Sequence, residues 1–420
     1  MQDFVIRDNQ LYVENTPLSA LADHYGTPCY VYSKAAVTRA YQAYADALDD
    51  HPGKICYAVK ANSNLALLQL LAQLGAGFDI VSGGELKRVL HAGGDPGRII
   101  FSGVGKTKLE MRHALEVGIS CFNVESEAEL YALSRVATER GCRANVSLRV
   151  NPDVDANTHP YISTGLKENK FGIDIDFAFE VYQRASQLPG INIVGVDCHI
   201  GSQLVQTTPF MDALDRLLLL IDRLGDADIT IQHIDLGGGM GITYKDEKPP
   251  EVATYLAQIK AKLGQRKLEL VLEPGRSIVG NAGVLLTEVV YLKPGDHKNF
   301  AIVDAAMNDN IRPSLYQAWQ NMVPLRHNSS AVEKIWDIVG PICETSDFLA
   351  KDRKLALAEG DRLAMMSSGA YGFVMSSNYN TRGRAPEVFV DGSEHHLVRR
   401  RETFADLIQG EHLLHSKTGA

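Results

Sequence analysis

From residue 55 to residue 272 the chain alternates short apolar runs of β-forming residues with longer segments whose apolar residues recur at helical spacing. This alternation predicts parallel strands joined by crossover helices. Eight such units in about 220 residues are typical of an α/β fold of the TIM-type (β/α)8 barrel class. The expected strands are Ile55–Val59, Phe78–Val81, Ile99–Ser102, Ser120–Val124, Asn145–Val150, Ile193–Cys198, Ile231–Leu236 and Leu268–Leu272.

A doubly wound sheet is the alternative, because it also alternates strands and helices. It does not require eight similar units. The run Gly237–Ile242 places Ile242 where a dinucleotide fingerprint requires glycine, which favours the barrel. The expected helices are Leu65–Leu74, Gly84–His91, Lys108–Val117, Glu127–Arg140, Phe177–Gln187, Pro209–Leu224 and Glu251–Leu263.

The two ends of the chain show a different pattern. Phe4–Val13 alternates like a half-buried strand, Cys29–Tyr32 is β-like, and short apolar runs after Val284 are separated by Pro, Gly and Asp. We therefore expect a barrel over residues 36–282 and a mainly β second domain built from residues 1–35 and 283–420. Its later strands are expected at Leu285–Leu292, Phe300–Val303, Glu333–Val339, Arg362–Met366, Glu387–Val390 and His396–Arg399.

Charge and composition narrow the possible partners. With 42 basic and 51 acidic residues the net charge is −9, and the only short basic run is Arg399–Arg401, so nucleic acid and anionic membranes are poor partners. The longest aliphatic run, Leu217–Ile221, is far too short to span a bilayer. Met1–Asn15 lacks the features of a signal peptide, which predicts a cytoplasmic protein. Six cysteines without a CxxC pair predict neither a disulfide framework nor a metal site.

Barrels of this type carry their chemistry at the C-terminal ends of the strands. Lys60 follows the first expected strand, where desolvation is expected to lower its pKa and its amine can form a Schiff base. The structural alternative is an ion pair with Asp79 or Glu273. After strands seven and eight, Gly237–Gly239 and Gly275–Arg276 can present backbone amides and a guanidinium to a phosphate. A tight turn is the alternative for the glycine run.

Two further residues extend this pattern. Glu273 is placed to keep a pyridine nitrogen protonated, and His199 is flat enough to cover one face of such a ring. For His199 the alternative is a core histidine that holds a backbone hydrogen bond. Taken together with Lys60 and the glycines, these residues indicate a pyridoxal phosphate site.

Several motifs resemble those of a known family. The segments 57–62, 199–203, 237–239 and 273–276 resemble the pyridoxal-phosphate decarboxylases with an alanine-racemase-like barrel. Within that family, the segments 159–165, 308–316 and 343–345 are similar to the branch that converts meso-2,6-diaminopimelate to L-lysine and carbon dioxide in bacterial lysine synthesis. The resemblance runs nearly end to end.

The resemblance implies roles for the cofactor site. Lys60 would bind pyridoxal 5'-phosphate covalently, His199 would stack on its ring and Glu273 would meet its nitrogen. Asp79 and Glu85 resemble supporting positions. The phosphate would be bound by Ser202, Gly237, Gly238, Gly239, Gly275, Arg276 and Tyr371.

The resemblance also implies how substrate is held. Around the distal carboxylate it places Arg276, Arg312 and Tyr316, with Tyr371 nearby, and it places Glu344 at the distal ammonium. Cys343 would be the proton donor. Because Cys343 and Glu344 would reach into the partner subunit's site, the resemblance implies a homodimer with shared active sites.

Three other functions remain open at this level. A decarboxylase of ornithine, arginine or carboxynorspermidine would share the barrel and cofactor but not the Arg312, Tyr316 and Cys343–Glu344 pattern. A non-catalytic relative should have lost Lys60 or Cys343. An alanine-racemase-like isomerase is disfavoured by Glu273, since it needs a less protonated ring nitrogen. The long segment 157–171 is expected to close over bound substrate.

Overall fold

The structure, a computed structural model, describes residues 3–49, 51–154, 170–327 and 330–414. The chain divides into two compact units. The first comprises Ser33–Gly283 and Gly369–Val374, and the second comprises Asp3–Tyr32, Val284–Ser368 and Met375–Ala420. The motif at 159–165 and most of the segment predicted to close over substrate lie outside the described residues.

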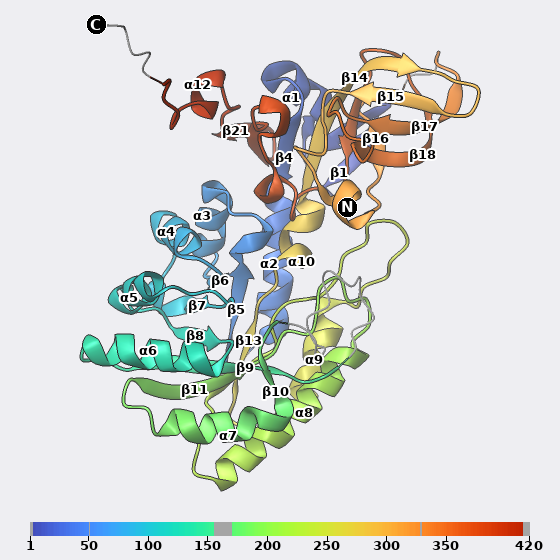
Figure 1. The fold of residues 1–420 in the computed structure, drawn as a ribbon. Coiled ribbons are helices and arrows are strands. Elements are labelled where there is room, and N and C mark those ends of the chain that lie inside the picture. The colour runs from blue at the N-terminus through green and yellow to red at the C-terminus, as the bar shows by residue number, and fades with distance from the viewer. Residues whose placement is uncertain (1–2, 50, 155–169, 328–329, 415–420) are drawn as a thin grey trace, which may run out of the picture. The chain divides into compact units, whose positions relative to one another are not determined.

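Eight parallel strands close a barrel in the first unit (Figure 1). Each strand pairs with the next, and the last, β13, pairs with the first, β5. The predicted barrel is confirmed, and every predicted strand overlaps an observed one. The strands are β5 (Gly53–Ala58), β6 (Gly77–Ile80), β7 (Ile99–Phe101), β8 (Cys121–Val124), β9 (Ala144–Asn151), β11 (Ile191–Asp197), β12 (His233–Asp235) and β13 (Glu269–Leu272), with the short β10 (Ile173–Asp174) added beside β9.

Helices surround the barrel between successive strands (Figure 1). Local signals fix where several begin: Ser82 and Ser126 accept hydrogen bonds from the amides of Glu85 and Glu129, and Thr107 forms a capping box with Glu110. The helices are α3 (Leu65–Gln73), α4 (Gly83–His91), α5 (Lys108–Val117), α6 (Glu127–Glu139), α7 (Ile175–Ser186), α8 (Thr208–Asp226), α9 (Val252–Leu263) and the short α10 (Arg276–Val279).

Two barrel helices, α2 and the short α10, were not predicted. Helix α2 (Lys34–Leu48) precedes the first barrel strand, and its buried face consists of Ala36, Val37, Tyr41, Tyr44 and Leu48. Alanine and tyrosine give a weaker hydrophobic signal than leucine or isoleucine, which explains why the pattern was missed.

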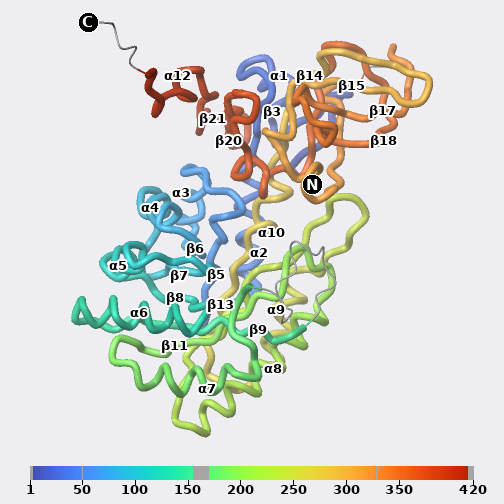
Figure 2. The backbone as a smooth tube through the Cα atoms, viewed as in Figure 1, coloured from blue at the N-terminus to red at the C-terminus, as the bar shows by residue number. Residues whose placement is uncertain are grey.

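The second unit is mainly β, as predicted. Strand β4 (Cys29–Ser33) from the N-terminal part lies between β14 (Gly283–Lys293) and β20 (Glu387–Asp391), so segments from both ends of the chain build one sheet (Figure 2). The order of this sheet is β18-β17-β15-β14-β4-β20-β21, and β14 also pairs with β19, which pairs with β16. The remaining bounds are β1 (Phe4–Arg7), β2 (Gln10–Val13), β3 (Thr16–Pro17), β15 (Asn299–Val303), β16 (Met322–Pro324), β17 (Glu333–Val339), β18 (Phe348–Ala356), β19 (Arg362–Met365), β21 (Glu394–Arg399), α1 (Leu18–Tyr25), α11 (Arg312–Tyr316) and α12 (Phe404–Leu407).

Strands β16 and β18 were not predicted. β18 lies at the edge of the sheet, and its residues Lys351–Lys354 are charged and largely exposed. Charged side chains protect a sheet edge from pairing with another chain, but they also remove the apolar alternation by which a strand is recognised.

Part of the barrel interior is apolar. Cys56, Ile100, Cys121, Val194 and Val271 form a buried apolar cluster contributed by five strands.

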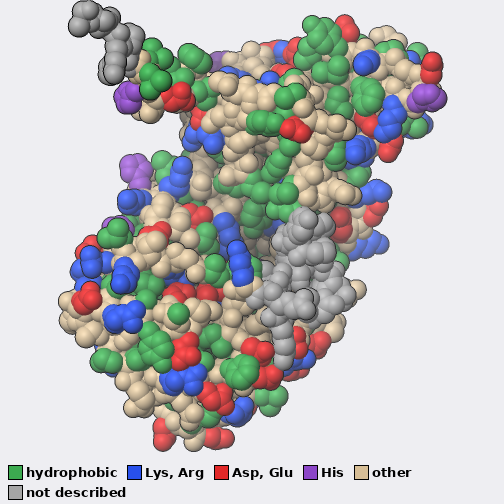
Figure 3. Space-filling view, in the orientation of Figure 1, with side chains coloured by type: hydrophobic (Ala, Val, Ile, Leu, Met, Phe, Trp, Pro, Cys, Tyr) green, Lys and Arg blue, Asp and Glu red, His purple; other side chains and the backbone are tan. Residues whose placement is uncertain are grey.

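On the outside, Figure 3 shows basic side chains interspersed with acidic ones over this face of the barrel unit. No helix in the described part of the chain combines the length and apolarity needed to cross a lipid bilayer.

Candidate active site

Buried polar side chains gather at the C-terminal ends of the barrel strands. Asp79, Asn123, Ser147, Asp197 and Asp235 come from five different strands, and each is at most 2 % exposed. Burying so many polar groups is unfavourable unless they bind one another or a ligand. This end of the barrel is where TIM-type enzymes hold their substrates.

Lys60 lies just beyond strand β5, and its Nζ is 2.5 Å from Asp79 Oδ2. The lysine side chain is 37 % exposed, whereas the Asp79 carboxylate is fully buried. Burial acts to lower the pKa of Lys60, but the carboxylates of Asp79 and Glu273 outweigh it, so the pKa lies above its ordinary value. The predicted fall in this pKa is therefore wrong for this state, because the facing acids belong to other strands. The ion pair proposed as the alternative does form.

Glu85 lies near enough to Asp79 and Lys60 for their charges to affect its pKa. Its carboxylate accepts a hydrogen bond of 2.7 Å from the backbone amide of Val81, just beyond strand β6. Burial raises the pKa of Glu85 to about 7, although that hydrogen bond opposes the rise.

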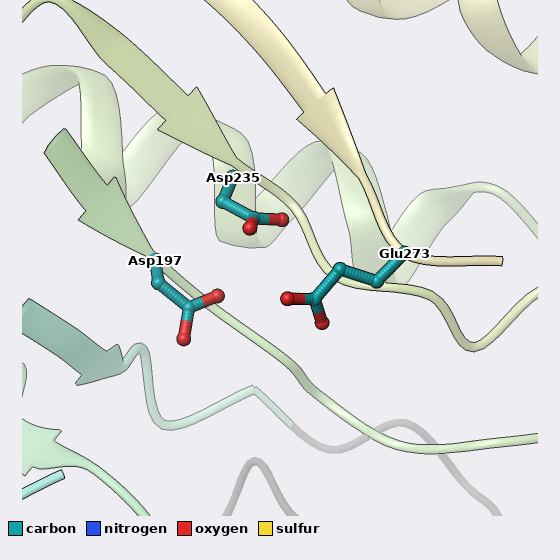
Figure 4. A group of neighbouring side chains, drawn as sticks. All are labelled: Asp197, Asp235 and Glu273. Carbon is teal, nitrogen blue, oxygen red and sulfur yellow. The ribbon is translucent and has the colours of Figure 1, made fainter. Parts of the chain in front are cut away.

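Three acids, Asp197, Asp235 and Glu273, point toward one another from adjacent strand ends (Figure 4). One oxygen of each lies within 4.8 Å of the others. Burial raises the pKa of Glu273 well above its usual range, and the neighbouring Asp235 and Asp79 add to the rise. Burial likewise raises the pKa of Asp235 to about 6. Three carboxylates this close cannot all be ionised without a balancing cation, so this cluster holds protons or faces a positive charge.

Neutral donors complete this acidic cluster. The Asn123 side-chain amide donates to Glu273 Oε1 at 3.3 Å and to Asp235 Oδ2 at 3.5 Å. The Ser102 hydroxyl donates to the same Glu273 oxygen at 3.4 Å. Glu273 is thus held in place by side chains that carry no charge.

The glycines after strand β12 make room for His199. A Cβ on Gly237 would lie 2.6 Å from His199 Nδ1, and one on Gly238 would lie 2.2 Å from the Glu273 carbonyl oxygen. The Gly238 amide donates to His199 Nδ1 at 3.3 Å, which orients the imidazole. Burial, together with Arg149 and Lys60, lowers the pKa of His199 well below its usual value, so the ring is neutral. Gly237 and Gly239 also have φ values of +65° and +101°, which favour glycine.

Arg276 lies just beyond strand β13 and contacts three residues from other segments of the chain. Its guanidinium donates to the Tyr244 hydroxyl at 2.6 Å and to Ser202 Oγ at 3.1 Å, and its central carbon lies 4.8 Å from the Tyr371 ring centre. Gly275, which precedes it, passes so close to strand β5 that a Cβ would lie 3.0 Å from the Cβ atoms of Ala58 and Ala61.

Tyr371 belongs to the barrel unit. The predicted domain boundaries place it in the β domain, but Gly369–Val374 groups with the barrel. Its backbone amide donates to the Ala61 carbonyl at 2.8 Å, and the Asn62 side chain donates to the Gly369 carbonyl at 3.1 Å. These bonds hold Tyr371 beside Lys60.

The other predicted substrate residues lie in the second unit. Arg312 is buried at the start of α11, and its amide donates to Asn310 Oδ1 at 3.3 Å, while Tyr316 ends the same helix half-buried. Cys343 and Glu344 are exposed. The hydroxyl of Ser314 in α11 donates to the Ser346 carbonyl at 2.6 Å, which ties α11 to the segment that carries Cys343 and Glu344.

The barrel residues fit pyridoxal phosphate. Lys60 offers an amine on a side chain that is 37 % exposed, Glu273 offers a carboxyl whose raised pKa a cationic ring nitrogen would reverse, and Ser202 and Arg276 offer donors for an anion. A Cβ on any of the three glycines would fill the cradle after strand β12, since each would lie within 2.6 Å of another atom.

Comparison with known proteins agrees with this chemistry. Residues 34–280 match the family model described as the pyridoxal binding domain of pyridoxal-dependent decarboxylases. The diaminopimelate decarboxylase of Pseudomonas aeruginosa is 64 % identical over 99 % of this chain and all of its own length. The chain belongs to the diaminopimelate decarboxylase family. The predicted family and cofactor class are confirmed.

Other members of the diaminopimelate decarboxylase family support the assignment. The Vibrio cholerae enzyme is 59 % identical over 95 % of this chain and 96 % of its own. The crystal structure of diaminopimelate decarboxylase from M. jannaschii in complex with L-lysine has a TM-score of 0.92 and 38 % identity, covering 98 % of each chain. The Helicobacter pylori enzyme complexed with L-lysine has a TM-score of 0.90 and 41 % identity, covering 93 % of this chain and 98 % of its own.

Sequence reasoning did not assign roles to Asp197, Asp235 and Asn123. All three occupy strand ends, so their position was a usable signal, but their mutual contacts join residues 112 apart in one case. It also missed Tyr379 and Asn380, which contact Glu344 and Cys343 across 35 and 37 residues. No local pattern marks these two residues.

Proposed function

We propose that the chain removes one carboxyl group from meso-2,6-diaminopimelate to give L-lysine and carbon dioxide, using pyridoxal 5'-phosphate. The observation that carries this proposal is the Lys60 amine paired with the buried Asp79, next to a buried acidic cluster that includes Glu273. The names of relatives at 59–64 % identity support the choice of substrate.

Bound pyridoxal phosphate supplies a protonated ring that accepts the electron pair released when the carboxylate leaves. In our proposal the Lys60 amine would hold the cofactor covalently. Glu273 holds the proton on the ring nitrogen, and Asn123 and Ser102 keep its carboxyl in place. The neutral His199 imidazole covers one face of the ring without adding a second positive charge.

The phosphate would be held by donors from three loops, those after β11, β12 and β13, and by a tyrosine. The proposed set combines a hydroxyl, backbone amides, a guanidinium and a phenol, which suit a dianion without requiring a metal ion. Arg276 already spans this set through its contacts with Ser202 and Tyr371. The residues are Ser202, Gly237, Gly238, Gly239, Gly275, Arg276 and Tyr371.

Substrate selection would depend on the end of the molecule that does not react. Diaminopimelate carries a carboxylate and an ammonium there, whereas ornithine and lysine carry only an ammonium. Arg276, Arg312, Tyr316 and Tyr371 would bind the carboxylate, and Glu344 would bind the ammonium. An analogue without the carboxylate would lose these charge-assisted hydrogen bonds, each worth about 1.5 to 3 kcal/mol.

Cys343 would then give its thiol proton to the carbon that has lost carbon dioxide. We further propose that the protein acts in the cytoplasm as a homodimer in which Cys343 and Glu344 complete the partner's site. Mixing inactive Lys60→Ala and Cys343→Ala chains tests this arrangement. Random exchange should restore about a quarter of the activity, because half of the dimers are mixed and each has one intact site. No recovery would show that each subunit completes its own site.

The first experiment on the reaction itself is product analysis. The protein is incubated with pyridoxal phosphate and, separately, with meso-diaminopimelate, ornithine, arginine and carboxynorspermidine, while carbon dioxide and amines are measured. We expect lysine from diaminopimelate alone. Carbon dioxide from another substrate would overturn the roles of Arg312 and Glu344 but keep those of Lys60 and Glu273.

A further inference from the structure

Two consecutive residues of the second unit contact the two consecutive residues that carry the proposed proton donor. The Tyr379 hydroxyl donates to Glu344 Oε1 at 2.5 Å, and the Asn380 side-chain amide donates to Cys343 Sγ at 3.3 Å. Asn380 Oδ1 also lies 3.9 Å from the same sulfur. The nitrogen and the oxygen of the Asn380 side chain therefore both contact the Cys343 sulfur, and in the shorter contact the sulfur is the acceptor.

The backbone that presents these residues is held in an uncommon conformation. Asn380 and Thr381 have φ values of +54° and +57°, in the left-handed region that a β-branched residue such as threonine rarely adopts. The Asn378 side chain closes the turn by donating to the Arg382 carbonyl at 3.0 Å and to Glu402 Oε2 at 2.8 Å. Such a conformation persists only where its surroundings enforce it.

The turn is anchored by Asn308 and Asp309, which belong to the motif 308–316 and have no role assigned above. Arg382 Nε donates to Asn308 Oδ1 at 3.1 Å, and its guanidinium lies 4.0 Å from the buried Asp309 carboxylate. In the same motif, Asn310 accepts the amide hydrogen bond of Arg312. The segment from Asn308 to Asn310 thus fixes the turn and the start of α11 together.

We propose that Tyr379 and Asn380 are positioning residues for the decarboxylation. Asn380 orients the Cys343 sulfur and stabilises the thiolate that forms when the S–H bond breaks and the proton passes to the substrate carbon. The electron pair stays on sulfur until solvent returns a proton. Tyr379 holds Glu344 ready for the distal ammonium. This inference rests on the proposed function, which supplies the roles of Cys343 and Glu344.

Alkylation of Cys343 tests the role of Asn380 independently of turnover. Thiolate, not thiol, reacts with iodoacetamide. In a Cys142→Ser background, which removes the other exposed cysteine of the described chain, the rate is followed by mass spectrometry on the cofactor-loaded protein. Asn380→Gly keeps the left-handed backbone and should slow alkylation about fivefold, as expected for loss of one hydrogen bond. Asn380→Asp keeps the shape but replaces the donor, and should slow it further.

Thr381→Gly is the matched control, because it changes the same turn without touching Cys343. Its alkylation rate should stay within about twofold of the parent, a change smaller than one hydrogen bond produces. An unchanged rate in Asn380→Gly, or an equal fall in Thr381→Gly, would overturn the role of Asn380. In turnover, Asn380→Gly should lower kcat about tenfold at constant KM, since it affects only the proton transfer.

Tyr379→Phe tests the second contact through the opposite kinetic pattern. Loss of the bond to Glu344 should raise KM for meso-diaminopimelate about tenfold and leave kcat nearly unchanged. Tyr291→Phe, at a 61 % exposed tyrosine of the same unit, should change neither constant. Equal losses in kcat for Tyr379→Phe and Asn380→Gly would overturn the division of roles between the two residues. If diaminopimelate is not decarboxylated at all, the proposed function fails, but the alkylation result still decides the contact between Asn380 and Cys343.

Discussion

In the barrel, Asp79, Asp235 and Glu273 are at most 6 % exposed, whereas Cys343 and Glu344 in the second unit are exposed to solvent. The barrel therefore shifts the charge states of its groups by burial and by neighbouring acids. The second unit positions its groups by hydrogen bonds from the turn containing Tyr379 and Asn380. Substitutions in the barrel should consequently change stability and pH dependence as well as activity, whereas those near Cys343 should change activity alone.

Lys60→Ala should produce the largest effect on the barrel side of this comparison. Without the amine, the covalent attachment of the cofactor and its absorbance band should be lost, and turnover should fall on the order of 10³-fold. Lys54→Ala is the control, because Lys54 starts the same strand and pairs with Glu269 at 3.1 Å at the opposite end of the barrel. A Lys60→Ala variant that keeps the absorbance and turnover would contradict the cofactor assignment.

Asp235→Asn tests how a buried acid contributes to the pH dependence of the free energy of unfolding. The pKa of Asp235 rises from 3.8 to about 6 on folding, mainly through burial, so the native state holds its proton more tightly. Its contribution to stability therefore falls as pH rises from about 4 to 6, by about 3 kcal/mol in total. Urea unfolding of the cofactor-free protein at pH 4 to 7 should show a flatter pH dependence for the variant. The surface variant Asp215→Asn should keep the parental slope; identical slopes for all three proteins would sink this prediction.

Gly238→Ala should weaken cofactor binding by about 30-fold, because its Cβ would lie 2.2 Å from the Glu273 carbonyl oxygen and force the loop to move. Absorbance titration with pyridoxal phosphate measures the effect. Gly225→Ala, in helix α8, is the matched control, since nothing lies within 4 Å of its added Cβ. Equal affinities in the two variants would mean that the glycine loop tolerates side chains.

Glu344→Gln should have the smallest effect and should sharpen the contrast between the two regions. Loss of the charge should raise KM for diaminopimelate about tenfold, while Tm stays unchanged because the side chain is exposed. Glu394→Gln, at another exposed acid of the second unit, should alter neither quantity. A clear fall in Tm for Glu344→Gln would show that this segment is structural.

The strand-to-helix alternation was sufficient to predict the barrel, since each βα unit is specified locally by its own apolar period and caps. Lys60, His199 and Glu273 were found because they directly follow predicted strands. The edge strand β18 and helix α2 were missed, because charged residues and an alanine-rich face weaken the local period.

The sequence by itself determined the barrel, the mainly β second unit and the identity of the reactive side chains at the strand ends. Only the tertiary structure decided their charge states and partners. Asp79 and Glu273 reverse the expected pKa shift of Lys60, and Asn380 reaches Cys343 across 37 residues. The reason is that an electrostatic or hydrogen-bonding partner is set by distance in space, which closure of the barrel and the turn at Asn380 create from residues far apart in the chain.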